Sequence, residues 1–293
     1  MFVTVGARYD GTLGDGYIYA SEDGVTWTEV LHRVAANAGF FGVHHNGLDT
    51  WVVVGTEGIV RSTDGITWTD PDAGPDVNGE SYSFMRDIHY YDGIWVAAGD
   101  FNVAVSTDAV TWLVADPDQF TGTIGSKAVL GKDYLGSTYW FIAGESKTLY
   151  RTDDPTALTG WTNINSGVDF HFTDGDGNPD FLGLTPDGND VWLTGMRNGL
   201  WYSEDNGDTF TVVDSPPDFG FDAQEDIWAW EYDPEADLWI GMREEGVPVW
   251  STGDPKTGAI AEIDDYPEIA ERQRGLTHCN GLWVAVGGQA AEG

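Results

Sequence analysis

The residues best suited to hold a metal ion lie in one acidic loop. Asp174, Asp176, Asn178 and Asp180 occupy alternate positions, separated by glycine or proline. Oxygen ligands spaced in this way, with glycine between them, let a loop wrap around a calcium ion. We therefore expect Ca²⁺ to be the one candidate cofactor of this chain. The alternative is an acidic surface turn that binds no metal.

Histidines form a second group of candidate ligands. His45, His89 and His278 come near the ends of candidate strands, and His44 directly precedes His45. Imidazoles that converge from neighbouring strands could bind a metal ion or an anion. The alternative is a polar lining that holds bound water.

The sequence does not single out a catalytic group. Acidic residues number 49 against 13 basic ones, so no pair of carboxylates stands out as the acid and base of a glycoside hydrolase. The single cysteine, Cys279, allows no internal disulfide, and we expect a buried, inert thiol. We therefore expect the protein not to be an enzyme.

A short polar sequence motif recurs along the chain and ends in an aromatic residue. Its first copy, residues 21–27, has the sequence SEDGVTW. In such a turn an aspartate can accept backbone N–H groups, glycine can take the left-handed conformation, and the aromatic ring can pack between sheets. We name these segments the serine–aspartate turns and expect a structural role for them. Their main residues are Ser21, Asp23, Trp27, Ser62, Asp64, Trp68, Ser106, Asp108, Trp112, Ser203, Asp205 and Phe210.

The turns alternate with a repeated strand pattern. Apolar runs that begin with Trp and end in Gly occur at Trp51–Gly55 and Trp95–Gly99, and again further along the chain. Runs of this kind, rich in Val and Trp, are typical of strands that are covered on both faces. The candidate strand before a run ends in a hairpin signal such as Asp92-Gly93, and the strand after it leads into the serine–aspartate turn. A short fourth strand is expected to begin at the Thr-Trp pair that ends the turn, as at Thr67-Trp68. Each unit therefore has four antiparallel strands, A to D.

The units repeat every 40 to 50 residues or so, which is the period of a β-propeller. We predict an all-β propeller of about six four-stranded blades in a single domain, residues 1–293. The sequence begins and ends partway through a unit: residues 2–6, 17–21 and 26–30 resemble strands B, C and D, and residues 275–279 and 282–287 resemble strands A and B. The closing blade would therefore combine residues 1–30 with 272–293, and one extra strand that resembles strand B would remain. Seven blades, two of them incomplete, are the alternative. In such a ring His45, His89 and His278 would line the central channel.

The serine–aspartate turns resemble the Asp-box, or BNR repeat, of sialidase-like and sortilin-like propellers. The copy at residues 203–210 has the usual spacing, and the others are one residue shorter. A sialidase would also need three arginines that clamp a carboxylate and a Tyr–Glu pair, but no Arg-Ile-Pro motif occurs near the start. Separately, the loop at 174–180 resembles the calcium loops of integrin-type and dockerin-type repeats, from which it departs at Phe172.

The formal net charge is −36, and only four residues are lysine. This surface resembles those of proteins from salt-loving organisms and predicts a halophilic or marine source; an ordinary acidic protein is the alternative. Nucleic acids and anionic membranes are not expected partners, because binding to phosphate needs clustered Lys and Arg. We find no run of about 20 apolar residues for a membrane helix and expect no signal peptide.

Short, diverged repeats of this kind also resemble the propeller domains of tailed-virus structural proteins. The resemblance implies a non-catalytic structural or host-recognition component of a virus particle, such as a tail fibre, turret or tail protein. It would be made in the host cytoplasm and located in the virion. Expected partners are other virion or scaffold proteins, a cell-surface glycan or receptor, or further copies of the chain. A glycan-active hydrolase and a cellular assembly scaffold are the alternatives.

Overall fold

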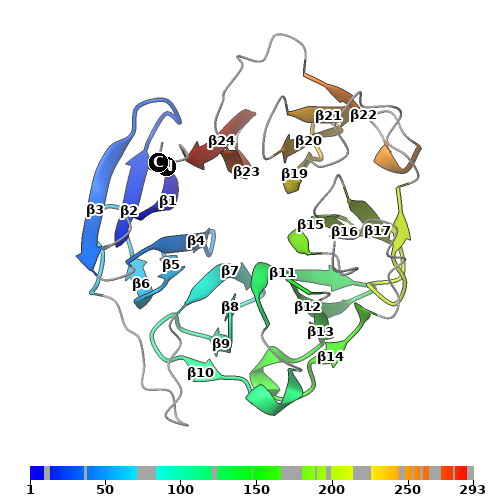
Figure 1. Cartoon of the computed structure of the whole chain (residues 1–293), viewed down its shortest axis with the longest axis horizontal. Coiled ribbons are helices and arrows are strands. Elements are labelled where there is room, and N and C mark those ends of the chain that lie inside the picture. Colours follow the sequence, from blue (N-terminus) through cyan, green and yellow to red (C-terminus); the bar gives the residue numbers. More distant parts are fainter. Residues whose placement is uncertain are drawn as a thin grey trace. The chain divides into compact units, whose positions relative to one another are not determined.

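The computed structural model describes residues 1–9, 14–35, 38–70, 84–120, 124–146, 148–165, 180–188, 190–195, 199–213, 226–243, 248–252, 254–257, 260–263, 272–279 and 281–288. Within these ranges the chain is all-β, with antiparallel sheets and short 3-10 turns between strands (Figure 1). It forms two compact units, Met1–Ile142 with Tyr150–Thr162, and Ala143–Leu149 with Asn163–Gly293. No described helix is long and apolar enough to cross a membrane.

Each sheet consists of strands that follow one another in the sequence. Two sheets with three strands come first: β1 (Phe2–Tyr9), β2 (Gly14–Ser21) and β3 (Thr28–Ala35), then β4 (Phe40–His45), β5 (Trp51–Gly55) and β6 (Gly58–Ser62). Two sheets with four strands follow: β7 (Met85–Tyr91), β8 (Ile94–Gly99), β9 (Val103–Ser106) and β10 (Leu113–Val114), then β11 (Ser126–Tyr134), β12 (Ser137–Gly144), β13 (Leu149–Thr152) and β14 (Thr162–Asn163).

The remaining sheets continue the same order. Two have four strands: β15 (Phe181–Asp187), β16 (Asp190–Gly195), β17 (Leu200–Ser203) and β18 (Thr211–Val212), then β19 (Ile227–Asp233), β20 (Leu238–Arg243), β21 (Val249–Thr252) and β22 (Ile260–Glu262). The last is a hairpin of β23 (Arg272–Cys279) and β24 (Leu282–Gly288). The B-, C- and D-like strands expected near the start and the A- and B-like strands expected near the end are therefore present.

The apolar runs are buried on both faces, as their composition predicts. In β5, Val52 and Val54 belong to one core cluster with Trp95 of the next sheet, whereas Val53 belongs to another with Ile18 of the preceding sheet. Successive side chains of a strand point to opposite faces, so both faces of β5 lie in packed layers. This face-to-face packing of consecutive sheets explains why the runs do not alternate with polar residues.

The glycines that end the first two runs, Gly55 and Gly99, are required by a close backbone approach. A Cβ on Gly55 would lie 2.0 Å from the carbonyl oxygen of Gly39, and a Cβ on Gly99 would lie 2.3 Å from that of Phe84. These oxygens accept hydrogen bonds from the residues after the glycines, Thr56 and Asp100, at 3.0 and 3.2 Å. In these two sheets the same contacts therefore link the start of the first strand to the end of the second.

The fourth strands differ from expectation in where they begin. They were expected to start at the Thr-Trp pair, but β10, β14 and β18 start directly after the aromatic residue. The aromatic side chain packs into the core at the end of the turn, and pairing resumes beyond it. In the second sheet the described residues contain no fourth strand, although the Thr69 N–H donates to the Arg61 carbonyl at 3.0 Å.

Candidate functional site

The serine–aspartate turns are closed by side-chain hydrogen bonds. The Ser62 hydroxyl donates to Asp64 Oδ1 at 2.9 Å and accepts the N–H of Gly65 at 2.8 Å. Asp64 Oδ1 also accepts the N–H groups of Ile66 and Thr67 at 2.9 and 2.6 Å. Bonds of the same kind occur in the turns of Asp23 and Asp108. One oxygen of each carboxylate is thus occupied by its own turn.

The electrostatics of these aspartates follow from those bonds. Donation from the Thr26 and Val25 N–H groups holds the pKa of Asp23 at about 2, and the equivalent bonds hold the pKa of Asp64 at about 2. The pKa of Asp108 is lowered for the same reason. Such carboxylates stay ionised near neutral pH, which does not suit proton transfer in catalysis.

The longer turn at Asp205 accommodates its extra residue by backbone geometry. Asn206 and Gly207 both take left-handed φ values, 60° and 84°. Asp205 Oδ1 still accepts the Thr209 N–H at 2.8 Å and the Ser203 hydroxyl at 2.8 Å. Burial raises the pKa of Asp205, but the bonds from Thr209 and Ser203 outweigh that effect and lower it overall.

The aromatic residues of the turns vary in depth. Trp112 and Phe210 are buried, and Trp112 lies in the core cluster between the second and third sheets. Trp68 is half-buried and packs against the cluster that contains Val53. Trp27 is also half-buried. Trp112 and Phe210 are therefore core residues, whereas Trp27 and Trp68 are partly exposed.

Two further turns of the same type escaped the sequence analysis. Asp154 Oδ1 accepts two N–H groups of the 3-10 turn η2 (Pro155–Ala157), and the Asp154 N–H donates to Thr152 Oγ1 at 3.2 Å. Asp254 Oδ1 accepts the Lys256 N–H at 2.9 Å at the start of η4 (Pro255–Thr257). The missed signal is an Asp-Pro pair at the same offset from a Thr that ends a third strand.

The predicted calcium loop falls largely outside the described residues, which exclude Asp174, Asp176 and Asn178. Asp180 is described, and its Oδ1 accepts the Ser146 N–H at 2.8 Å. Among described residues no group of three or more His, Cys, Asp and Glu side chains is arranged to hold a metal ion. Calcium binding therefore stays a prediction.

The structure brings together His44 and His89, from neighbouring strands β4 and β7. Their ring centroids are 4.3 Å apart and the rings meet edge to face. Burial lowers the pKa of His44 to about 4, with a smaller contribution from His45. Burial, and then His44, lower the pKa of His89 well below its usual value. The two imidazoles are therefore neutral near pH 7.

The other predicted channel histidines have separate partners. The His45 ring packs at a tilt against Trp51, with 4.3 Å between ring centroids, and His45 Nδ1 accepts the Gly47 N–H at 3.1 Å. His278 Nε2 lies 3.1 Å from Asp233 Oδ2, an ion pair whenever the imidazole is protonated. Adjacent strand residues point to opposite faces, which is why His44 rather than His45 meets His89.

Two carboxyl groups were not singled out from the sequence, one on β7 and one on β19, each the first strand of its sheet. Asp87 Oδ2 accepts the Val129 N–H at 2.8 Å, and burial raises the pKa of Asp87 to about 6. Burial alone raises the pKa of Glu231, on β19, to about 7. The available signal was a charged residue inside a strand that packs on both faces.

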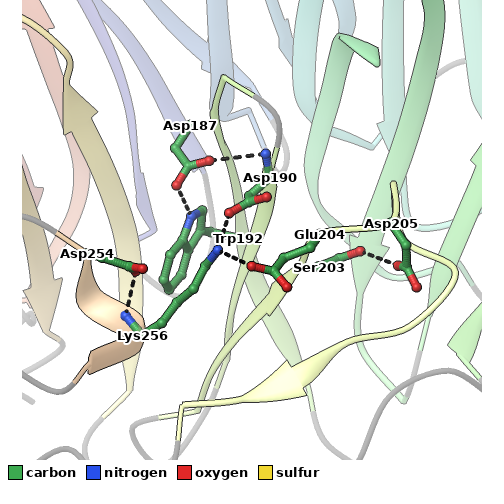
Figure 2. A network of polar contacts seen from close by, with 8 residues as sticks. All are labelled: Asp187, Asp190, Trp192, Ser203, Glu204, Asp205, Asp254 and Lys256. Carbon is green, nitrogen blue, oxygen red and sulfur yellow. Dashed lines mark hydrogen bonds and ion pairs between the residues drawn. The ribbon is translucent and has the colours of Figure 1, made fainter. Parts of the chain in front are cut away.

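A polar network joins two neighbouring sheets of the second unit (Figure 2). Lys256 Nζ donates to Glu204 at 2.8 Å and to Asp190, and it lies 4.7 Å from the Tyr202 ring centroid. Burial lowers the pKa of Lys256, but the bonds to Asp190 and Glu204 outweigh burial and raise it overall. Nearby, the Trp192 indole donates to Asp187 at 2.7 Å. Lys256 therefore links the hairpin of β16 and β17 to η4, and we call Lys256, Asp190 and Glu204 the Lys256 latch.

The comparisons with known proteins identify the fold alone. No family model matches this chain, and no curated protein matches it. Solved structures do match: YCF48 bound to D1 peptide has a TM-score of 0.63 at 14% identity over 96% of this chain and 88% of that one. YCF48 from Cyanidioschyzon merolae has a TM-score of 0.60 at 13% identity over 98% of this chain and 94% of that one.

A bacterial sensor domain also matches. The extracellular domain of the putative one component system BT4673 from B. thetaiotaomicron has a TM-score of 0.62 at 11% identity, over 89% of this chain. This chain spans about a third of its length, 33% of that chain. The propeller fold predicted from the repeats is thus supported by structures that share little sequence with the chain.

Proposed function

We propose that this protein is a non-catalytic propeller that serves as a structural or host-recognition component of a virus particle. The observation that supports the non-catalytic part is that the turn carboxylates accept hydrogen bonds within their own turns, as a structural role requires. The virion setting is supported by the resemblance of the diverged repeats to tail and fibre propellers. Its partners would be neighbouring virion proteins or a receptor on the host surface.

The distribution of arginines favours this proposal over a sialidase-like hydrolase. Arg86 pairs with Asp100, Arg33 lies 3.3 Å from Asp70, and the Arg151 guanidinium lies over the Tyr139 ring. A substrate carboxylate would need several arginines directed at one point. These three described side chains are each held by a separate local partner.

A cellular assembly scaffold is the second candidate. YCF48 matches over nearly the full length of both chains, and one of its structures holds the D1 peptide. A propeller of this size can therefore present a face to a peptide of another protein. Since the likeness extends to the fold alone, it supports this candidate by analogy.

Ring closure by both ends, in a single six-bladed domain, belongs to the same proposal. Among the described residues the N-terminal sheet has three strands, β1–β3, and the C-terminal sheet has two, β23 and β24. Together these two sheets would supply the four strands of one blade and one extra strand. A seven-bladed ring remains the alternative.

Fractionation of the natural source tests the proposal. We expect the protein to sediment with particles through a density gradient and to release no sugar from a panel of common glycans. Recovery in a host-cell fraction would replace the virion role by the scaffold role. Sugar release that a single carboxylate substitution abolishes would overturn the non-catalytic assignment.

A further inference from the structure

Three phenylalanines are exposed near one edge of the first unit, where chain segments connect neighbouring sheets. Phe41, Phe84 and Phe101 expose 36%, 37% and 60% of their surface. They stand at the start of β4, directly before β7, and between β8 and β9. We call these residues the phenylalanine patch. Exposed aromatic groups gathered in this way are typical of interaction surfaces rather than of a solvated face.

An arginine and an aspartate hold the patch together. Arg86 donates to both carboxylate oxygens of Asp100, at 2.8 and 2.7 Å. The Arg86 guanidinium also lies 4.7 Å from the Phe41 ring centroid, and the Asp100 N–H donates to the Phe84 carbonyl at 3.2 Å. Phe101 directly follows Asp100. The three phenylalanines are therefore linked to one charge-compensated pair, Phe41 through its ring, Phe84 through its backbone carbonyl and Phe101 through the chain.

The backbone of Phe84 points to a role beyond folding. Its φ is 60°, a left-handed value that is an outlier for a bulky residue. In the next sheet the residue directly before the first strand is Gly125, with a φ of 53°. Glycine takes this conformation without strain, so the fold has no need of an aromatic residue here. Strained residues of this kind cluster at functional sites.

The charge of the protein indicates what kind of partner the patch would accept. The formal net charge of −36 attracts cationic partners over distance. At close range Phe41 already takes a guanidinium on its ring, and aromatic faces favour such cations. Because Asp100 compensates Arg86, the centre of the patch does not repel a second cation.

We propose, resting on the binding role argued above, that the phenylalanine patch docks a basic segment of a partner protein. An Arg or Lys side chain of that segment lies against the open faces of Phe84 and Phe101, and its apolar neighbours cover the ring edges. The partner is thus recognised by cation–π and apolar contacts together. Charge attraction alone would act equally over the whole acidic surface.

Calorimetric titration with a synthetic peptide of alternating Arg and Leu tests this assignment at physiological salt. We expect Phe84→Gly and Phe101→Ser each to weaken binding at least tenfold. Leu48→Ser, at a side chain that is 80% exposed on another turn, serves as the matched control and leaves affinity unchanged. A peptide with citrulline in place of Arg should bind at least tenfold more weakly to the wild type.

The melting temperature separates binding from folding. Phe84→Gly relieves the left-handed strain but removes a ring that is only 37% exposed, so we expect a lower melting temperature, and peptide binding is measured below the unfolding transition of every variant. Phe101→Ser, at a side chain that is 60% exposed, keeps the binding test open if Phe84→Gly fails to fold. No binding by the wild type, equal affinity in all variants, or equal affinity for the citrulline peptide would each overturn the assignment. Sedimentation with particles despite such a result would leave the proposed function standing, whereas recovery in a host fraction would remove the virion role whatever the peptide does.

Discussion

At the scale of single residues, a buried hydroxyl organises each serine–aspartate turn. Ser62 is 4% exposed, donates to Asp64 and accepts two N–H groups. We expect Ser62→Ala to lower the free energy of unfolding by about 1–2 kcal/mol, because those groups lose a partner away from water. Urea unfolding measures the change, and Thr63→Ala, at the exposed neighbour, is the control. Equal effects of the two changes would contradict the role of the hydroxyl.

Glu231 gives a prediction for pH dependence. Burial raises its pKa from 4.5 to about 7, so between these values the folded protein keeps a proton that the unfolded chain releases. The folded state then binds more protons, and stability falls as pH rises from about 4.5 to 7, by about 3 kcal/mol for this group. Glu231→Gln should remove this fall. Its measure is the difference between wild type and variant in urea unfolding at pH 5 and pH 8.

The exposed change Glu22→Gln controls for the general effect of removing one negative charge. It should leave the pH dependence of the wild type in place. If Glu231→Gln and Glu22→Gln change the pH dependence of the free energy of unfolding equally, the Glu231 carboxyl is ionised in the folded protein, which would contradict the raised pKa.

At the scale of elements, the sequence predicted strands well and contacts between side chains less well. Trp51–Gly55 and its repeats are strands because their apolar runs are long enough to show burial on both faces. The Asp-Pro turns at Asp154 and Asp254 were missed because proline replaces the glycine and starts a 3-10 turn. His44 and His89 meet across two strands, and such a contact depends on register and side-chain direction, which neither residue's local sequence contains.

The latch around Lys256 is the element-scale feature most open to test. Its ammonium group bridges Asp190 and Glu204, whose side chains are 15% and 68% exposed. We expect Lys256→Met to cost about 2 kcal/mol, because Asp190 is left partly buried without its cation. Glu204→Gln should cost about 0.5 kcal/mol or less, since an exposed pair is screened by water. Urea unfolding of both variants distinguishes a latch from a surface ion pair, for which the two costs would be alike.

At the scale of the whole molecule, the charge of −36 should make stability depend on salt. Repulsion among carboxylates acts over about 10 Å at 0.1 M salt and over about 3 Å at 1 M. We expect the melting temperature to rise steadily from low to molar NaCl. A melting temperature that stays level or falls over that range would argue against adaptation to a saline source.

The last prediction concerns the C-terminal hairpin of β23 and β24, which packs against the preceding sheet. Strand β23 lies against β19 and β20, and His278 on it contacts the buried Asp233. Deleting residues 272–293 would uncover the side of β19 and β20 that β23 covers, and in the proposed ring it would also open the closing blade. We therefore expect the truncated protein to unfold or aggregate as a whole, which light scattering and thermal unfolding would detect. Deleting residues 289–293 alone, beyond β24, is the matched control and should change neither. A protein lacking 272–293 that stays monomeric with an unchanged melting temperature would mean that these strands do not close the propeller.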